Sequence, residues 1–170
     1  VVIGINQGMQ PIAGFNFGAK HYTRLNQVLK YAITIATGIW IVGFIVCVLL
    51  ATPVACAFTN DEELLKEAAH ALRVMNLVVP IIGFQMITIG FFQSIGKAGI
   101  SIFLSLTRQL LFLVPLLLIL PNFFGLEGIW YSVPIADGTS AITAAIVLIY
   151  HMRKFKMRGK LENSNLQTEI

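Results

Sequence analysis

Residues 4–20 read GINQGMQPIAGFNFGAK, which is too rich in amides for a helix that faces only lipid and too apolar for a loop. Polar side chains are costly in hydrocarbon, so inside a membrane they face a cavity or another helix. We therefore expect residues 1–18 to form a helix of a membrane bundle. The chain starts at Val1 without an initiator methionine, and we expect it to be a fragment that begins inside this helix.

The composition indicates a membrane protein. Hydrophobic residues make up 56% of the chain and charged residues only 12%, which lies well outside the range of soluble domains. A membrane-spanning helix needs about 20 mostly apolar residues. Four further stretches meet this requirement, so we expect an all-α integral membrane protein, a helical bundle with spans at about 1–18, 31–52, 74–95, 100–120 and 128–150.

The charges between these spans alternate in sign. Basic residues follow the first, third and fifth spans, and acidic residues follow the second and fourth. Short loops rich in Lys and Arg stay in the cytoplasm, so we expect the amino end outside and the carboxyl end inside a bacterial inner membrane. The basic residues on which this topology depends are Lys20, Arg24, Lys30, Lys97, Arg153, Lys154, Lys156, Arg158 and Lys160.

Two segments outside the spans have features of their own. Thr59 and Asn60 can cap a helix, and the apolar residues that follow recur on one face, which predicts an amphipathic interfacial helix over 60–72. A solvated linker is the alternative for this segment. The polar residues 157–170 predict a disordered cytoplasmic tail after a membrane unit over 1–156.

The opening stretch resembles the MATE family, the multidrug and toxic compound extrusion transporters. The residues that carry this resemblance are Gln7-Gly8-x-Gln10-Pro11-Ile12-x-Gly14-x-Asn16-x-Gly18-Ala19, followed by basic residues. Arg108 with Pro115, and then Gly125-x-x-Gly128-x-Trp130-x-x-x-Pro134 with Asp137, look like the last helical hairpin of the family. The segment from Phe58 to Leu72 is similar to its interfacial helix. The resemblance covers nearly the whole chain.

The resemblance implies a C-terminal lobe of a twelve-span transporter, with part of span 8 and all of spans 9 to 12. Family members exchange a Na⁺ or H⁺ gradient for the export of drugs, often small organic cations. The partners that follow are the lipid bilayer, such compounds and the missing N-terminal lobe. Some members carry a coupling carboxylate in the tenth span, but residues 74–95 contain no Asp or Glu. We therefore expect the coupling-ion site in the missing lobe, with Asp137 as a fallback.

Five amide side chains are candidates for the substrate cavity. Amides can bond to varied substrates without requiring a charge, or they can hold neighbouring helices together. Under the resemblance we favour the cavity for Gln7 and Gln10 over Asn6, and both roles stay open for Gln85 and Gln93.

Arg108 and Asp137 are the two charged residues deep inside predicted spans. Counting about 1.5 Å per residue, Arg108 lies about 12 Å from one surface and Asp137 about 15 Å from the other, and these depths nearly coincide in a core of about 30 Å. We expect an intramembrane ion pair, which acts either as a structural clamp or as a contact that changes between transport states.

Other functions find less support. Sequence motifs for nucleophilic, metal-dependent or nucleotide-dependent enzymes are not found, so we expect a transporter without cofactor or metal rather than an enzyme. Five of the twelve basic residues follow the last span, which indicates a membrane-surface anchor and no nucleic acid. A related lipid-linked oligosaccharide flippase, which would favour a more basic cavity, and a noncatalytic membrane subunit are the alternatives.

Overall fold

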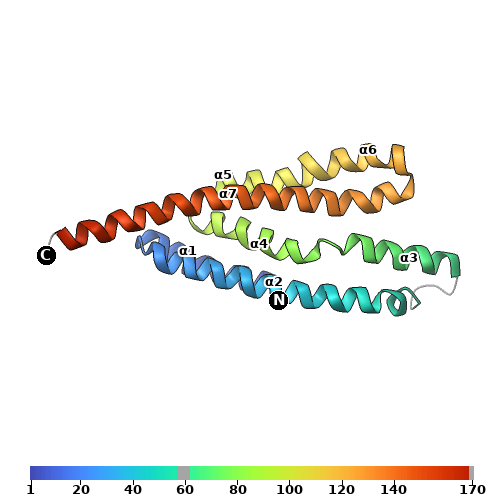
Figure 1. The fold of residues 1–170 in the computed structure, drawn as a ribbon, viewed down its shortest axis with the longest axis horizontal. Helices are drawn as coiled ribbons and strands as arrows, with labels where there is room; N and C mark the ends of the chain where they lie inside the picture. Colours follow the sequence, from blue (N-terminus) through green and yellow to red (C-terminus); the bar gives the residue numbers. More distant parts are fainter. Residues whose placement is uncertain (57–61, 169–170) are drawn as a thin grey trace.

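The chain folds into an elongated bundle of helices that lie roughly along one axis (Figure 1). The structure is a computed structural model, and it describes residues 1–56 and 62–168. All regular elements in these two ranges are helices, which confirms the all-α prediction. They are α1 (Val2–Gly18), α2 (Tyr22–Cys56), α3 (Glu62–Met75), α4 (Val79–Ser94), α5 (Ala98–Leu106), the π-helix η1 (Thr107–Leu113), α6 (Val114–Phe124) and α7 (Leu126–Thr168).

Three helical segments of the described chain are long and apolar enough to cross a membrane. They are Tyr22–Leu50 in α2, Ala98–Phe124, which joins α5, η1 and α6, and Leu126–Met157 in α7. The expected spans 31–52, 100–120 and 128–150 fall within them or reach just past their ends. The first expected span, 1–18, corresponds to α1, whose 17 residues are fewer than a full span needs.

The expected span over 74–95 is broken rather than continuous. Helix α3 ends at Met75, a turn follows, and α4 begins at Val79, with a bend of 42° between the two helices. Pro80 explains the new start, because proline has no N–H to donate and is tolerated only in the first turn of a helix. Together the two helices could form a fourth span.

Two further boundaries differ from the sequence predictions. Helix α2 begins at Tyr22, so Arg24 and Lys30 lie on this helix rather than in a loop. Helix α7 continues to Thr168, whereas we predicted disorder from 157 onward. Lys, Arg, Met and Leu favour helix and no proline follows Pro134, so nothing in the tail stops the helix that begins inside the membrane. Helix α3 covers most of the predicted interfacial helix over 60–72, and the proposed caps Thr59 and Asn60 lie outside the described residues.

Helix α4 lies in the centre of the bundle and contacts α1, α2, α5 and α7. Its buried residues include Ile87, Phe91 and Phe92, which pack with Leu25 of α2 and Ala13 of α1 in the main core. Helices α1 and α2 lie on one side of α4, and the hairpin of α5, η1, α6 and α7 lies on the other side (Figure 1). Large exposed apolar residues on α2, α6 and α7 form the outer surface, as expected for helices in contact with lipid.

Two features shape the last hairpin. Pro115 has no N–H for the carbonyl of the preceding turn, and the helix widens into η1 just before it. Between α6 and α7 a single residue, Gly125, turns the chain with φ +58°, a conformation that glycine adopts readily. A Cβ on Gly128 would come 2.5 Å from the Leu120 carbonyl oxygen, so this glycine allows α6 and α7 to approach closely.

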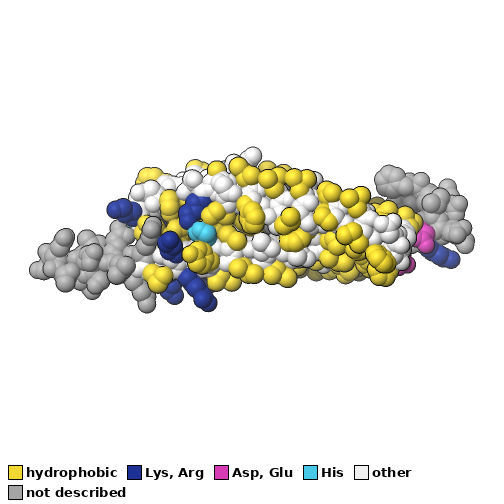
Figure 2. Space-filling view, turned by 90° about the horizontal axis from the view of Figure 1, so that it is seen from above, with side chains coloured by type: hydrophobic (Ala, Val, Ile, Leu, Met, Phe, Trp, Pro, Cys, Tyr) yellow, Lys and Arg dark blue, Asp and Glu magenta, His cyan; other side chains and the backbone are white. Residues whose placement is uncertain are grey.

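The charged side chains gather at the two ends of the bundle. Figure 2 shows most Lys and Arg side chains at the end nearer the C-terminus, and Asp and Glu with a basic side chain at the opposite end. The surface between them is covered largely by hydrophobic side chains. Charged ends separated by an apolar surface are typical of a helical bundle that crosses a membrane.

Candidate functional site

An ion pair joins η1 to the middle of α7. Arg108 Nε donates to Asp137 Oδ1 at 2.6 Å, and the side chains of Arg108 and Asp137 are 35% and 5% exposed. Hydrogen bonds between ionised groups are short and strong, and a buried carboxylate needs such a partner. Counting about 1.5 Å per residue from Leu126, Asp137 lies about 16 Å along α7, near the middle of the bilayer core. The structure thus brings together the two residues that the sequence analysis paired.

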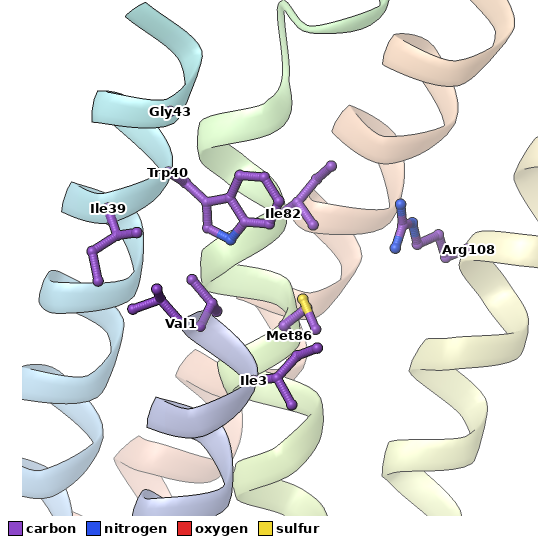
Figure 3. A pocket seen from close by; sticks show the side chains of 9 residues that line it. Val1, Ile3, Ile39, Trp40, Gly43, Ile82, Met86 and Arg108 are labelled. Atoms are coloured by element: carbon purple, nitrogen blue, oxygen red, sulfur yellow. The ribbon is translucent and has the colours of Figure 1, made fainter. Parts of the chain in front are cut away.

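A cavity of about 640 Å³ lies beside this ion pair. Figure 3 shows that Arg108 extends toward it from η1, opposite residues of the first turn of α1, the middle of α2 and the start of α4. Among the lining residues Arg108 carries the one charge, and the walls are otherwise apolar. The lining residues are Val1, Val2, Ile3, Ile39, Trp40, Gly43, Ile82, Met86 and Arg108.

Trp40 lines this cavity, although the sequence analysis did not single it out. Its Nε1 is buried and has no hydrogen-bond partner among the described residues. The indole lies against α4 at Gly83, where a Cβ would come 2.3 Å from Trp40 Cδ1 and 3.1 Å from the Ala36 carbonyl oxygen. Trp40 could have been singled out from the sequence by its position in the middle of a predicted span, because tryptophan in membrane helices is enriched at the interfaces.

Two of the predicted amides lie between helices. Asn6 of α1 lies against α4 at Gly90, where a Cβ would come 1.9 Å from Asn6 Oδ1. Gln85 of α4 is 1% exposed, and its Nε2 donates a hydrogen bond to Ser140 Oγ of α7. Asn6 Oδ1 and Gln85 Oε1 have no partner in the described part of the chain. Both side chains therefore lie at helix contacts, and neither lines the cavity beside Arg108.

The other three amides are also absent from the lining of that cavity. Gln7 is exposed and Gln10 is half-buried on α1, and their role in a substrate cavity stays a prediction. Gln93 is exposed and lines a second cavity of about 320 Å³ between α4 and α5, together with Ser101 and Ser105. Within residues 1–56 and 62–168, no group of three His, Cys, Asp or Glu residues lies close enough to hold a metal ion.

A comparison of the sequence with models of protein families decides the family. The model described as MatE matches residues 1–119, which is more than half of the chain. The chain belongs to the MatE family. MatE multidrug transporters are secondary transporters, and this membership confirms that the chain is not an enzyme.

Curated relatives are described as multidrug exporters. The protein described as multidrug export protein MepA of Staphylococcus aureus is 25% identical over 153 residues, which cover 90% of this chain and 33% of the relative. The protein of the same description from Staphylococcus haemolyticus is 23% identical over the same length. This MatE chain therefore spans about a third of the length of the relatives that it matches.

Solved MatE structures share the helix arrangement. The multidrug transporter DinF-BH is 40% identical and superposes with a TM-score of 0.84, covering 91% of this chain and 34% of that one. A multidrug resistance transporter in its inward-facing conformation is 25% identical, with a TM-score of 0.85 over 92% of this chain and 37% of that one. An outward-facing structure described in the same words reaches 0.83 at 25% identity, with 92% and 36% covered.

Proposed function

We propose that this chain forms the C-terminal lobe of a multidrug efflux transporter that exports small organic compounds, often cations. The observation that carries this proposal is the cavity at mid-membrane, whose walls are apolar apart from Arg108. Binding sites for small molecules are concave and mostly apolar, with a few polar groups that orient the ligand. Asp137 offsets the positive charge of Arg108, so the ion pair does not repel a cation as an isolated arginine would.

Transport by this lobe would use alternating access, with the lobe moving as one unit. The matches to inward-facing and outward-facing structures support this proposal, because their TM-scores of 0.85 and 0.83 differ little. An arrangement that fits both conformations requires little change inside the lobe. The change between states would then occur where this lobe meets a second one, which would complete the cavity.

We place the coupling-ion site, for Na⁺ or H⁺, in that second lobe. The relatives are about three times as long as this chain, which leaves room for it. The described part of the central helix α4 contains no carboxylate, and the deeply placed Asp137 is already held by Arg108.

The orientation in the membrane follows from the charged ends. We propose that the end with most of the Lys and Arg side chains lies in the bacterial cytoplasm, together with the C-terminus. The acidic end, with Glu67 and Glu127, then faces outside. Both terminal positions of α7 agree with this orientation, because α7 begins beside the acidic end and ends beside the basic one (Figures 1 and 2).

The alternatives are a flippase for lipid-linked oligosaccharides and a noncatalytic membrane subunit. A flippase cavity should attract a pyrophosphate, but the one basic residue that lines this cavity is already paired with Asp137. A noncatalytic subunit does not require a cavity at mid-membrane. Both alternatives therefore explain less of the geometry.

The test is dye efflux from cells that express the intact transporter, driven in turn by a Na⁺ and by an H⁺ gradient. We expect export with one of the gradients, and loss of export when Ile82→Trp fills the cavity from α4. Ile81→Trp is the matched control, because Ile81 is exposed and does not line the cavity. Equal efflux by both variants, or no export with either gradient, would contradict the proposal.

A further inference from the structure

A groove separate from both cavities described above lies between α2 and α7 at the basic end of the bundle. Its volume is about 260 Å³, and α2 and α7 are in contact beside it. Its walls are apolar, and its other lining residues are an amide and two basic side chains. The lining residues are Asn26, Leu148, Ile149, Met152, Arg153 and Lys156.

The groove crosses the boundary between the bilayer core and the headgroups. Counting about 1.5 Å per residue from Leu126 at the opposite boundary, Leu148 lies about 33 Å and Arg153 about 40 Å along α7. The hydrocarbon core is about 30 Å thick, and the headgroup region extends the bilayer to about 40–45 Å. The headgroup region is thus about 5–7 Å thick on each side, so Leu148 lies at the edge of the hydrocarbon core, and Arg153 and Lys156 lie just beyond the lipid phosphates, from where their long side chains can reach back to them.

The two basic side chains of the groove have no acidic partner in the described part of the chain, and a lipid can supply one. Arg153 and Lys156 are exposed. Among the described carboxylates, Glu67 lies on α3 and Glu127 at the start of α7, both toward the other end of the bundle, and Asp137 is paired with Arg108 at mid-depth. Asn26 is half-buried, and its Oδ1 is fully buried with no hydrogen-bond partner among the described residues. Because this atom is closed off, a ligand in the groove does not reach it, and the two basic side chains are the groups that select the ligand.

We propose that this groove binds one anionic phospholipid of the cytoplasmic leaflet. Arg153 and Lys156 bind the phosphate, since guanidinium and ammonium groups are the usual partners of phosphate oxygens. The first part of an acyl chain packs along Leu148, Ile149 and Met152. Basic pockets between membrane helices on the cytoplasmic side are suited to such headgroups. The lipid would hold α2 and α7 together at this end, whatever the bundle transports.

The test measures lipid binding by the protein purified from the membrane in detergent, with retained lipids counted by native mass spectrometry. We expect phosphatidylglycerol to bind as a single retained molecule and phosphatidylcholine to bind much more weakly. A basic residue near a membrane surface contributes about a five-fold gain in affinity for anionic lipid, so Arg153→Gln with Lys156→Gln should weaken binding by about 30-fold. Asn26→Asp, which places a negative charge in the wall of the groove, should also weaken retention.

The matched control removes the same charge at the same end. Lys20→Gln with Lys30→Gln changes two exposed basic residues that do not line the groove, and it should leave retention within about two-fold. Equal weakening by the two double variants would mean general attraction to a basic surface and would overturn the proposal. Displacement of the lipid by glycerol phosphate at an equal concentration would do the same, because the groove would then bind a free phosphate.

Discussion

The Arg108–Asp137 ion pair allows a sharp prediction about stability. Arg108→Ala leaves a carboxylate whose side chain is 5% exposed without its cation. Removing one member of a buried ion pair costs about 3–5 kcal/mol, because the other charge stays buried without compensation. Asp137→Ala leaves Arg108, which is 35% exposed and long enough to extend toward water. We expect a smaller loss for this variant, about 1–3 kcal/mol.

The double variant separates the ion pair from simple loss of packing. With both charges removed, no isolated charge remains, so the double variant should be more stable than Arg108→Ala alone, with an interaction energy of about 2 kcal/mol or more. For a chain of 170 residues, 1 kcal/mol corresponds to about 2–4 °C in melting temperature, so Arg108→Ala should lower it by roughly 6–20 °C.

The assay follows thermal unfolding of the purified protein in detergent by loss of the monodisperse peak in size-exclusion chromatography. Arg24→Ala is the control, because it removes an exposed arginine at the end of the bundle and should shift the melting temperature by no more than about 2 °C. If the double variant loses the sum of the two single losses, the side chains do not stabilise each other and the argument fails.

Three more variants test the neighbouring contacts. Gly83→Ala should lower the free energy of unfolding by about 1–3 kcal/mol, because the new Cβ would come 2.3 Å from Trp40 Cδ1. Adding Trp40→Leu to the same chain should recover part of that loss. No destabilisation by Gly83→Ala would mean that α2 and α4 are less close than the structure shows. Gln85→Leu should lower the free energy of unfolding by less than about 1 kcal/mol, because it removes the unpartnered Oε1 and the Ser140 hydroxyl can donate instead to a carbonyl of its own helix. A loss above about 2 kcal/mol would show that the Gln85 amide is a main contact between the helices. Trp40→Phe should raise the KM of dye efflux by about three- to ten-fold with kcat unchanged, because the smaller ring removes apolar contact area from the wall of the proposed site, and an unchanged KM would remove Trp40 from that site.

The positions of the helices and of the ion pair could be predicted from hydrophobic stretches and isolated charges in the sequence. Long apolar runs locate helices well, because no other element satisfies its backbone inside a membrane. The pairing of Arg108 with Asp137 was also accessible, because helix rise converts sequence position into depth and two opposite charges at one depth attract strongly.

The helix ends and the cavity were harder to predict. The break before Pro80 depends on where the turn forms, and apolar side chains continue across it without a change in composition. The π-helix beside Pro115 is a backbone response that has no distinct residue pattern. Which amides face a cavity depends on the rotation of each helix against its neighbours, and here Asn6 and Gln85 turn toward helix contacts while Trp40 faces the cavity.

The ion pair also has a consequence for how the last two spans enter the bilayer. An arginine or an aspartate at the centre of a single inserting helix costs about 2.5–3.5 kcal/mol. Gly125 joins α6 and α7 through a turn of one residue, so both helices reach the insertion machinery almost together. If they insert as a hairpin, Arg108 and Asp137 partition into lipid as a neutral pair. Lengthening the turn at Gly125 would separate the two insertion events and expose each charge to lipid alone.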